Sequence, residues 1–373
     1  MPISTINTNS IADDAVTVPK VADQVLTHRN LIINGAMVID QRNAGAAVTY
    51  SSGTPAYPLD RWYGQGVTSA GAFTLQQSTD VPAGFNNSLK ATVTTASTPS
   101  GTQVYRLIQR IEGFNTADLN LGTANAKTLT MSFWVKSSVT GTFGGSFWGG
   151  SATAWFPFSY TINSANTWEY KTVSIGAASS TPATAFNTTT GIGLQLTFNL
   201  GAASAKLTTP SSWIYGATEY YGPTGQTNLI ETNGATFYIT GVQLEVGDTA
   251  TPFEHRQYGQ ELALCQRYAQ QVVNGESTTQ AVALGHGQSG TVAYYYYQMP
   301  VAMRNGPALT YSSLSDFLND DGVGGSVPAT LSVIRSTTIS CGISASGLST
   351  AAGRAAQLRA NNSSARLLLS SEL

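Results

Sequence analysis

The stretch LTMSFWVK, residues 129–136, alternates between apolar and polar side chains. Because successive side chains of a β-strand point to opposite faces, a period of two predicts a strand with one buried face. That face would carry Leu129, Met131, Phe133 and Val135. LQLTFNL at 194–200 repeats the pattern and predicts a second strand of the same kind.

Other segments extend the set of strands. TFYITGVQLE at 236–245 alternates but shifts by one residue at Gly241, which predicts a β-bulge. Shorter strands are predicted at 73–77, 89–93 and 168–175. Clusters of Gly, Ser, Asn, Pro and Thr separate these strands, and no amphipathic helical stretch of 12 or more residues interrupts them. The sequence therefore predicts an all-β fold with a jelly-roll β-sandwich over 30–258.

A change of pattern follows the sandwich. ELALCQRYAQQ, residues 261–271, is rich in helix-forming residues and predicts a short helical linker over 259–271. Strand patterns then resume at 291–299, 329–340 and 364–373. They predict a second, smaller β domain over 272–373.

The N-terminal segment 1–29 has a large apolar residue at every fifth position. These residues are Ile6, Ile11, Val16, Val21 and Leu26. A spacing of five matches neither the helical turn nor the β pleat, so one chain cannot bury them with a single amphipathic element. Three chains wound about an axis would bury them on one another, which predicts a short extended arm for trimerisation or attachment. An unstructured terminus is the alternative.

Composition excludes several classes of function. Charged residues make up 10% of the 373 residues and the net charge is −2, so nucleic-acid binding is not expected. The sequence has no run of 18 apolar residues, so membrane insertion is not expected. MPISTINTNS at the N-terminus lacks the features of a secretory signal. Cys265 and Cys341 lack metal-ligand spacing and are expected to be buried thiols.

Catalysis is not predicted. Glycan hydrolysis needs two carboxyl groups about 5–9 Å apart. The candidate pairs are Glu112 with Asp118, Glu245 with Asp248, and Asp320 with Asp321. Each pair is expected to be solvated or to form a turn, and no G-x-S-x-G nucleophile motif occurs. No cofactor is predicted, apart from a structural calcium ion for which Glu245 and Asp248 are the nearest ligands.

Binding has better support, because aromatic residues make up 10% of the chain. Those outside the alternating strands or in Gly-rich loops are Trp148, Trp155, Trp213, Tyr215, Tyr220 and Tyr221. Rings among Ser, Thr, Asn and Gln suit sugars, whose C–H faces stack on aromatics while their hydroxyls pair with neutral groups. The alternative is that these rings fill the sandwich core or a subunit interface.

Several stretches resemble tail-fibre and receptor-binding-type virion proteins of bacteriophages and prophages. They are NLIINGAMVIDQRNAG at 30–45 with PLDRWYG at 58–64, ITGVQLEVGDTATPFEHRQYGQELALCQRYAQQ at 239–271, and MPVAMRNGPAL at 299–309 with the terminal NNSSARLLLSSEL. SIADDAVTVPKVADQVLTHRNLI resembles the segments that lead into such fibres. The resemblance implies a trimeric, β-rich virion component whose jelly roll resembles carbohydrate-binding modules.

These observations predict a non-enzymatic phage virion protein, assembled in the host cytoplasm. The expected role is a homotrimeric tail fibre or receptor-binding protein. It would attach to other virion proteins through the arm and bind a bacterial surface polysaccharide. A capsid decoration or head-fibre protein is the alternative. A tailspike depolymerase is less favoured, because the sequence has no repeat of about 20–25 residues such as a parallel β-helix shows.

Overall fold

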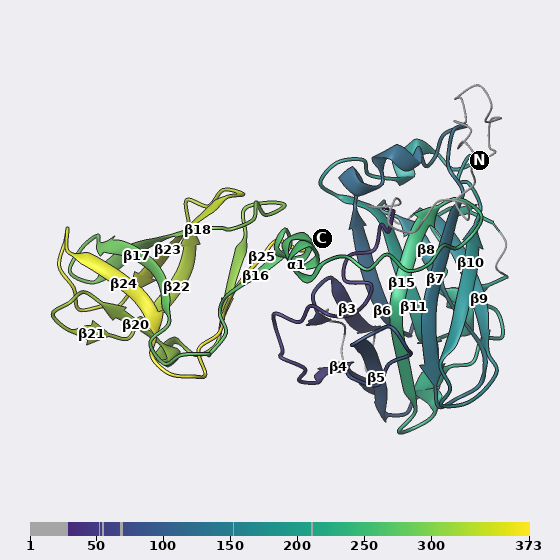
Figure 1. The fold of residues 1–373 in the computed structure, drawn as a ribbon, viewed down its shortest axis with the longest axis horizontal. Helices are drawn as coiled ribbons and strands as arrows, with labels where there is room; N and C mark the ends of the chain where they lie inside the picture. The colour runs from purple at the N-terminus through teal and green to yellow at the C-terminus, as the bar shows by residue number, and fades with distance from the viewer. Residues whose placement is uncertain (1–28, 52, 54–55, 68–69, 152, 210–211) are drawn as a thin grey trace, which may run out of the picture.

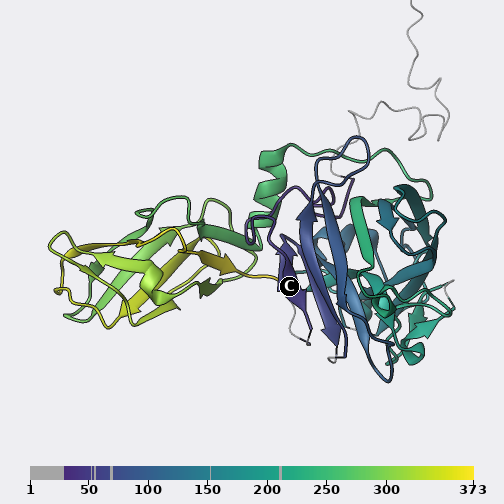
Figure 2. The ribbon, with the colours of Figure 1, turned by 90° about the horizontal axis from the view of Figure 1, so that it is seen from below.

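The computed structural model describes residues 29–51, 53, 56–67, 70–151, 153–209 and 212–373. Two β bodies meet near helix α1 (Tyr258–Gln266) and the C-terminus (Figures 1 and 2). Within these ranges no helix is long and apolar enough to cross a membrane. The predicted arm residues Ile6, Ile11, Val16, Val21 and Leu26 lie outside the described residues.

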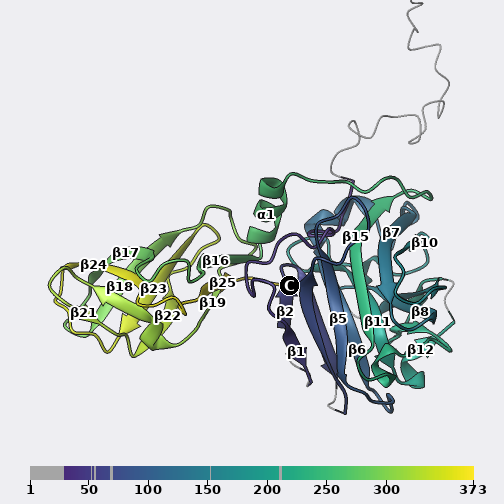
Figure 3. The same cartoon turned by 60° about the horizontal axis from the view of Figure 1, so that its bottom comes forward.

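The larger body is a sandwich of two antiparallel sheets (Figure 3). In spatial order, the six-stranded sheet contains β1 (Val48–Tyr50), β4 (Ala72–Ser78), β5 (Ser88–Thr95), β15 (Thr236–Val246), β7 (Leu129–Ser137) and β10 (Glu169–Ile175). The seven-stranded sheet contains β13 (Ile214–Tyr215), β9 (Ala154–Ile162), β8 (Gly141–Gly149), β11 (Ile192–Ala202), β6 (Val104–Glu112), β3 (Trp62–Val67) and β2 (Ala56–Leu59). The short strands β12 (Leu207–Thr208) and β14 (Gly222–Pro223) pair in parallel. The all-β jelly-roll prediction is confirmed.

The sandwich core lies between the two sheets. Its six-stranded side includes Leu129, Met131, Phe133 and Val135, each at most 1% exposed, as their alternation predicted. The Phe133 ring lies 5.1 Å from the Phe198 ring of the opposite sheet. The other face of β7 is also covered, which the period of two did not predict. The chain after β15 folds back over it, and the Thr130 hydroxyl donates to the Gly247 carbonyl (2.8 Å).

The predicted bulge at Gly241 is confirmed. Pairing of β15 with β7 slips between Thr240 and Gln243, and Gly241 has φ +62°. A Cβ at this position would lie 2.6 Å from Cζ of Phe85. Glycine is required here both by the left-handed backbone and by the ring that packs against it.

Replacing Gly241 tests this double requirement. Gly241→Ala is expected to lower the free energy of unfolding by about 1–3 kcal/mol, since backbone strain and steric overlap add. Gly234→Ala is the control, because Gly234 has φ +76° but no atom within 4 Å of its virtual Cβ. Urea denaturation should rank Gly241→Ala as clearly less stable. Equal midpoints would show that Phe85 moves aside without cost.

The smaller body also consists of two sheets. The three-stranded sheet contains, in order, β16 (Ala269–Val273), β25 (Leu367–Ser370) and β19 (Ala308–Tyr311). The seven-stranded sheet contains β21 (Gly325–Ser326), β20 (Phe317–Asp320), β24 (Ala355–Ala360), β17 (Ala281–Gly287), β18 (Val292–Gln298), β23 (Ser340–Ser346) and β22 (Thr330–Ile334). The strand predicted at 329–340 ends early, because Arg335 has φ +47° and the Thr337 side chain accepts from the Ser340 N–H (3.1 Å).

The junction follows the predicted linker with different bounds. Helix α1 covers 258–266, and the last residues of the predicted linker, 269–271, belong to β16. Cys265 in α1 and Cys341 in β23 are both buried and unpaired, as predicted. Burial raises the pKa of both thiols, to about 11 for Cys341.

Candidate functional site

Three of the predicted rings form one cluster on the outer face of the seven-stranded sheet of the sandwich. Phe147 points into the core, so the next residue of β8, Trp148, points outward. Trp148 lies opposite Trp155 of β9, and their indoles stack with centroids 5.4 Å apart and planes 16° apart. Tyr221 meets Trp155 edge-on at 5.3 Å. Trp148, Trp155 and Tyr221 are called the aromatic cluster below.

Tyr221 reaches the cluster because the chain after β11 folds back across the sheet. The Asn199 side chain donates to the Tyr221 carbonyl (3.1 Å). The Arg106 guanidinium lies 4.3 Å from the Tyr221 ring, a cation–π contact. Burial raises the pKa of Tyr221 to about 12, so its hydroxyl stays protonated. The ring is therefore fixed and neutral.

The cluster holds buried polar groups that lack partners. The indole N–H groups of Trp148 and Trp155 and the hydroxyl of Ser146 find no hydrogen-bond partner among the described residues. Ser146 lies two positions before Trp148 and therefore on the same face of β8. By contrast, the indoles of Trp62 and Trp213 donate to backbone carbonyls at 3.0 and 2.7 Å. All three atoms are buried, and Trp155 and Ser146 are at most 1% exposed, so a ligand on the outer face reaches the Trp148 ring but not these groups.

A polar network continues the cluster across the sheet. Gln195 of β11 lies opposite Trp148, and Arg110 of β6 lies opposite Gln195. The Gln195 side-chain oxygen accepts from Arg110 Nε (3.0 Å) and from the Tyr63 hydroxyl (3.3 Å). Trp155, Trp148, Gln195 and Arg110 thus form one row over four strands, called the outer-face row. Trp148 and Arg110 are its partly exposed members.

The other three predicted rings lie elsewhere. Trp213 is 9% exposed and packs against Phe156 and Phe186 at 5.5 and 5.4 Å, so it follows the core-filling alternative. Tyr215 is 57% exposed but lies opposite Ala154, hence on the other face of the sheet from Trp155. Tyr220 is half-buried beside Tyr221.

Two acids predicted to be solvated or to form turns are instead buried. Glu112 is 1% exposed and accepts from Arg267 and from the Tyr268 hydroxyl. Glu245 is 3% exposed and accepts from the Thr251 N–H (2.9 Å) and hydroxyl (2.6 Å). The turn prediction holds for Asp321, whose carboxylate accepts from two successive backbone N–H groups.

The acid pairs do not converge on a recognisable metal centre. Asp248 is exposed and accepts from the Thr249 hydroxyl (3.1 Å), whereas both oxygens of Glu245 face Thr251. Among the described residues there is no group of three or more His, Cys, Asp or Glu that could hold a metal ion. A calcium site at Glu245 and Asp248 stays a prediction.

Sequence reasoning missed Gln195, Arg110 and Ser146. The signal was present in LQLTFNL, where Gln195, Thr197 and Asn199 form the polar face of the strand. The alternation predicted only one buried face for this strand, but these three residues of the other face are at most 1% exposed. Buried polar positions on a strand mark a covered surface, which only the tertiary structure identifies.

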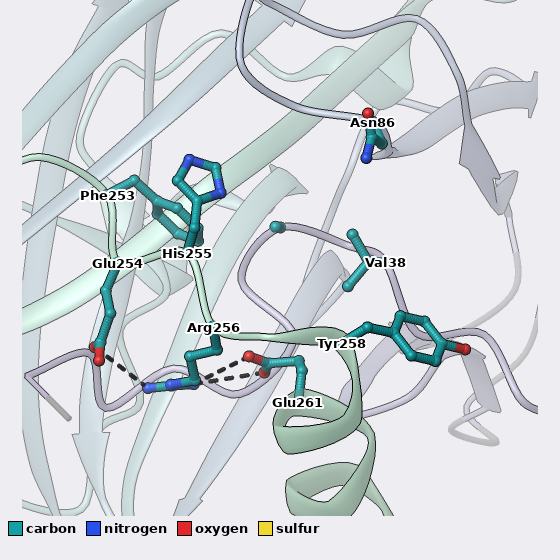
Figure 4. Close-up of a pocket in the computed structure, with 9 residues that line it drawn as sticks. Val38, Asn86, Phe253, Glu254, His255, Arg256, Tyr258 and Glu261 are labelled. Atoms are coloured by element: carbon teal, nitrogen blue, oxygen red, sulfur yellow. Dashed lines mark hydrogen bonds and ion pairs between the residues drawn. The ribbon is translucent and has the colours of Figure 1, made fainter. Parts of the chain in front are cut away.

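A separate pocket of about 250 Å³ lies between α1 and the sandwich (Figure 4). Phe253 and His255 line one side, and Val38 and Asn86 lie across from them. Its charged groups are already paired within the chain. Arg256 pairs with Glu261 (3.4 Å) and donates to the Ile32 carbonyl (3.0 Å), and Glu254 accepts from the Asn30 N–H (2.8 Å). This ion pair and these hydrogen bonds mainly anchor the chain at Asn30.

The stretches that carry the phage resemblance converge at the junction of the two bodies. Arg61 of PLDRWYG pairs with Glu372 near the C-terminus, and its guanidinium lies 3.6 Å from the Tyr268 ring. Arg304 of MPVAMRNGPAL donates to the carbonyls of Ser371 (2.8 Å), Glu372 (2.7 Å) and Thr190 (2.9 Å). These motifs therefore hold the two bodies together.

Glu112 is the central acid of this joint. Arg267 donates to both of its oxygens at 2.8 and 2.6 Å, and the Tyr268 hydroxyl donates at 2.7 Å. Although burial raises the pKa of Glu112, these hydrogen bonds outweigh it and lower the pKa below the usual value. The carboxylate is therefore ionised at neutral pH and binds residues that follow α1.

Asp60, next to Arg61, makes the stability of the protein depend on pH. Burial raises the pKa of Asp60 from 3.8 to about 6, and Arg42 offsets this only in part. Because the pKa of Asp60 is higher in the folded than in the unfolded state, the protonated carboxyl group favours folding. This contribution to stability is complete below pH 3.8 and is lost as the pH rises from 3.8 through about 6. Relative to Asp60→Asn, the wild type should lose about 2–3 kcal/mol of unfolding free energy between pH 4 and pH 7. Urea titrations at both pH values measure this, and a constant difference would contradict it.

Comparisons with known proteins add similarity of fold only. No protein-family profile matches the sequence, and no curated protein gives a significant match. One solved structure that aligns is the enzymatically active domain of tailspike protein 4 of bacteriophage CBA120. Its identity is 14% and its TM-score 0.31, over 58% of this chain but 21% of the tailspike chain.

Carbohydrate-binding modules align over the same share of the chain. A family 11 module from Clostridium thermocellum, in complex with a β-1,3-1,4-mixed-linked tetrasaccharide, has 9% identity and a TM-score of 0.27, over 54% of this chain and 96% of its own. A CBM22-1 xylan-binding domain from Paenibacillus barcinonensis has 10% identity and a TM-score of 0.23, over 56% and 99%. At these TM-scores the matches support no conclusion about function.

Proposed function

We propose that this protein is a non-enzymatic glycan-binding protein and that its sandwich binds a saccharide at the outer-face row. The observation that carries the proposal is the Trp148 ring, which is partly exposed on the outer face and is held by stacking on the buried Trp155 indole. Arg110, the other partly exposed member of the row, is a donor of the kind that sugar hydroxyl and ring oxygens accept from.

The row provides the two kinds of contact that sugar recognition uses. The partly exposed Trp148 indole offers an apolar surface for the C–H face of a sugar ring. Arg110 lies in the same row and donates to the buried Gln195 oxygen (3.0 Å) and to the Leu373 carbonyl, so its side chain loses little conformational entropy when a ligand arrives. The row suits a hydroxyl-rich saccharide rather than an apolar ligand.

Immobilised bacterial surface polysaccharides test the binding directly. Biolayer interferometry with the full chain should give saturable binding to at least one polysaccharide, and free oligosaccharide of the same repeat should compete for it. If no polysaccharide of a broad panel binds at micromolar protein, glycan binding is refuted. Incubation of the bound polysaccharide should leave its chain length unchanged, because we propose no hydrolysis. Shortened chains would favour a depolymerase.

We further propose that the protein is a homotrimeric phage tail fibre or receptor-binding protein, carried on the virion through residues 1–29. The resemblance of several stretches to such proteins and the five-residue apolar period of the arm support this proposal. Three glycan sites on one particle component would raise the apparent affinity by avidity.

The position on the particle and the oligomeric state have separate tests. Mass photometry should give a species of three times 39.1 kDa, and a monomer at micromolar concentration would refute the trimer. Antibody labelling of purified phage particles should mark the tail. Label on the capsid would instead favour the alternative, a capsid decoration or head-fibre protein.

A further inference from the structure

A second cleft, distinct from the outer-face row, opens where the two bodies meet. It has a volume of about 350 Å³, within the range of small-ligand sites. The sandwich contributes Arg42 and Asn43, which precede β1, and Tyr57 of β2. The smaller body contributes Gln271, Thr310, Tyr311, Ser312, Arg366 and Leu368. Figure 3 shows β2 on the side of the sandwich that faces β16, β19 and β25.

The register of the three-stranded sheet builds one wall of this cleft. Gln271 of β16 and Thr310 of β19 both lie opposite Leu368 of the central strand β25. Directly opposite residues share a face, so an amide and a hydroxyl flank one aliphatic side chain. This arrangement resembles the outer-face row in its chemistry, with neutral polar groups beside an apolar surface.

The charge of the cleft differs from that of the outer-face row. Two guanidinium groups line it, and no Asp or Glu is among its lining residues within the described chain. Arg42 is neutralised, because it pairs with Glu372 and lies 3.5 Å from Asp60. Arg366 donates to the carbonyls of Ser363 (3.0 Å) and Ala365 (2.9 Å) and forms no direct ion pair among the described residues, although its charge helps to lower the pKa of Asp316. Arg366, offset only by the more distant Asp316, is therefore the positive charge available to a ligand.

Arg366 is also held in place. Although Arg366 is exposed, both carbonyls bind its Nη1 beside Gly275, which leaves Nε and Nη2 for a ligand. A fixed guanidinium binds carboxylate or phosphate oxygens through charge-assisted hydrogen bonds. Tyr57 and Tyr311, both partly exposed, line the same cleft and can contact a sugar ring.

We infer that this interdomain cleft binds an acidic saccharide, with the anionic group on Arg366 and the sugar unit among Tyr57, Tyr311, Gln271 and Thr310. The site is independent of the outer-face row. The anion is the carboxylate of a uronate or the phosphate of a phosphate-bearing glycan polymer, and both present the same oxygens to a guanidinium.

Isothermal titration calorimetry of the full chain tests the inference with digalacturonate, its dimethyl ester and glycerol 3-phosphate. Digalacturonate should bind at least tenfold more tightly than the uncharged ester, and binding should weaken several-fold in 0.5 M NaCl. Glycerol 3-phosphate binding that depends on Arg366 would identify phosphate as the preferred anion. Binding confined to digalacturonate would identify a uronate.

Variants locate the site and separate it from the proposed function. Arg366→Gln should weaken digalacturonate binding at least tenfold, and Arg366→Lys should restore part of it. Arg335→Gln, which removes an exposed arginine elsewhere in the smaller body, should have no effect. Trp148→Ala should also leave this binding unchanged. The inference is overturned if neither anionic probe binds, if the ester binds as well as the acid, if Arg366→Gln binds within twofold of the wild type, or if Trp148→Ala abolishes binding.

Discussion

Glu112→Ala is expected to lower the free energy of unfolding by about 2–4 kcal/mol, because Glu112 is buried whereas solvent screens the partly exposed Arg267. The change leaves the buried Tyr268 hydroxyl without its acceptor and Arg267 without its counter-charge. Because these residues follow α1, the loss should separate the smaller body from the sandwich before either body unfolds.

Calorimetry and small-angle scattering together measure this effect. Glu112→Ala should show a lower first transition and a larger radius of gyration than the wild type. Asp118→Ala is the matched control, since Asp118 is an exposed acid a few residues further on that pairs with Lys127 at 3.3 Å. An exposed pair contributes about 0–1 kcal/mol. If the two variants behave alike, the Glu112 joint does not hold the bodies together.

Trp148→Ala is expected to weaken polysaccharide binding by about 30-fold, because truncation of a central aromatic contact costs about 2 kcal/mol. Trp148 is partly exposed, so the sandwich should stay folded. Trp134→Ala is the matched control. Trp134 is also partly exposed and lies on the outer face of the other sheet, 5.4 Å from the Tyr170 ring.

Binding curves against the same immobilised polysaccharide distinguish the two variants. Trp148→Ala should bind more weakly than the wild type, and Trp134→Ala should bind with wild-type affinity. An equal loss in both would indicate general destabilisation, and an unchanged Trp148→Ala would remove the outer-face row as the site. Circular dichroism of both proteins checks that the fold is retained.

The alternation of apolar and polar residues was sufficient to predict much of the fold. The strand over 129–136 and the bulge at Gly241 were predictable, because alternation and its slip are properties of neighbouring residues. The covered outer face of β7 was not predictable, since it depends on the chain near Gly247 folding back over Thr130, more than 100 residues earlier.

The sequence predicted the residue types of the candidate site but not where each residue lies in the fold. Aromatic content selected Trp148, Trp155 and Tyr221, which do cluster, but also Trp213, which fills the core. Nothing local separates these cases, because a tryptophan between short strands suits either environment. Glu112 and Arg267 meet across 155 positions of sequence, and such a pair has no local signature.

The central claim is that a saccharide binds at the outer-face row, on the Trp148 ring. The most direct test is a ¹H–¹⁵N spectrum of the six indole N–H groups during titration with the polysaccharide fragment that binds. The signal of Trp148, assigned by single substitution, should shift most, because a sugar that stacks on its partly exposed ring changes the surroundings of the indole. Shifts confined to Trp134 or Trp168, or no shift at saturating ligand, would contradict it.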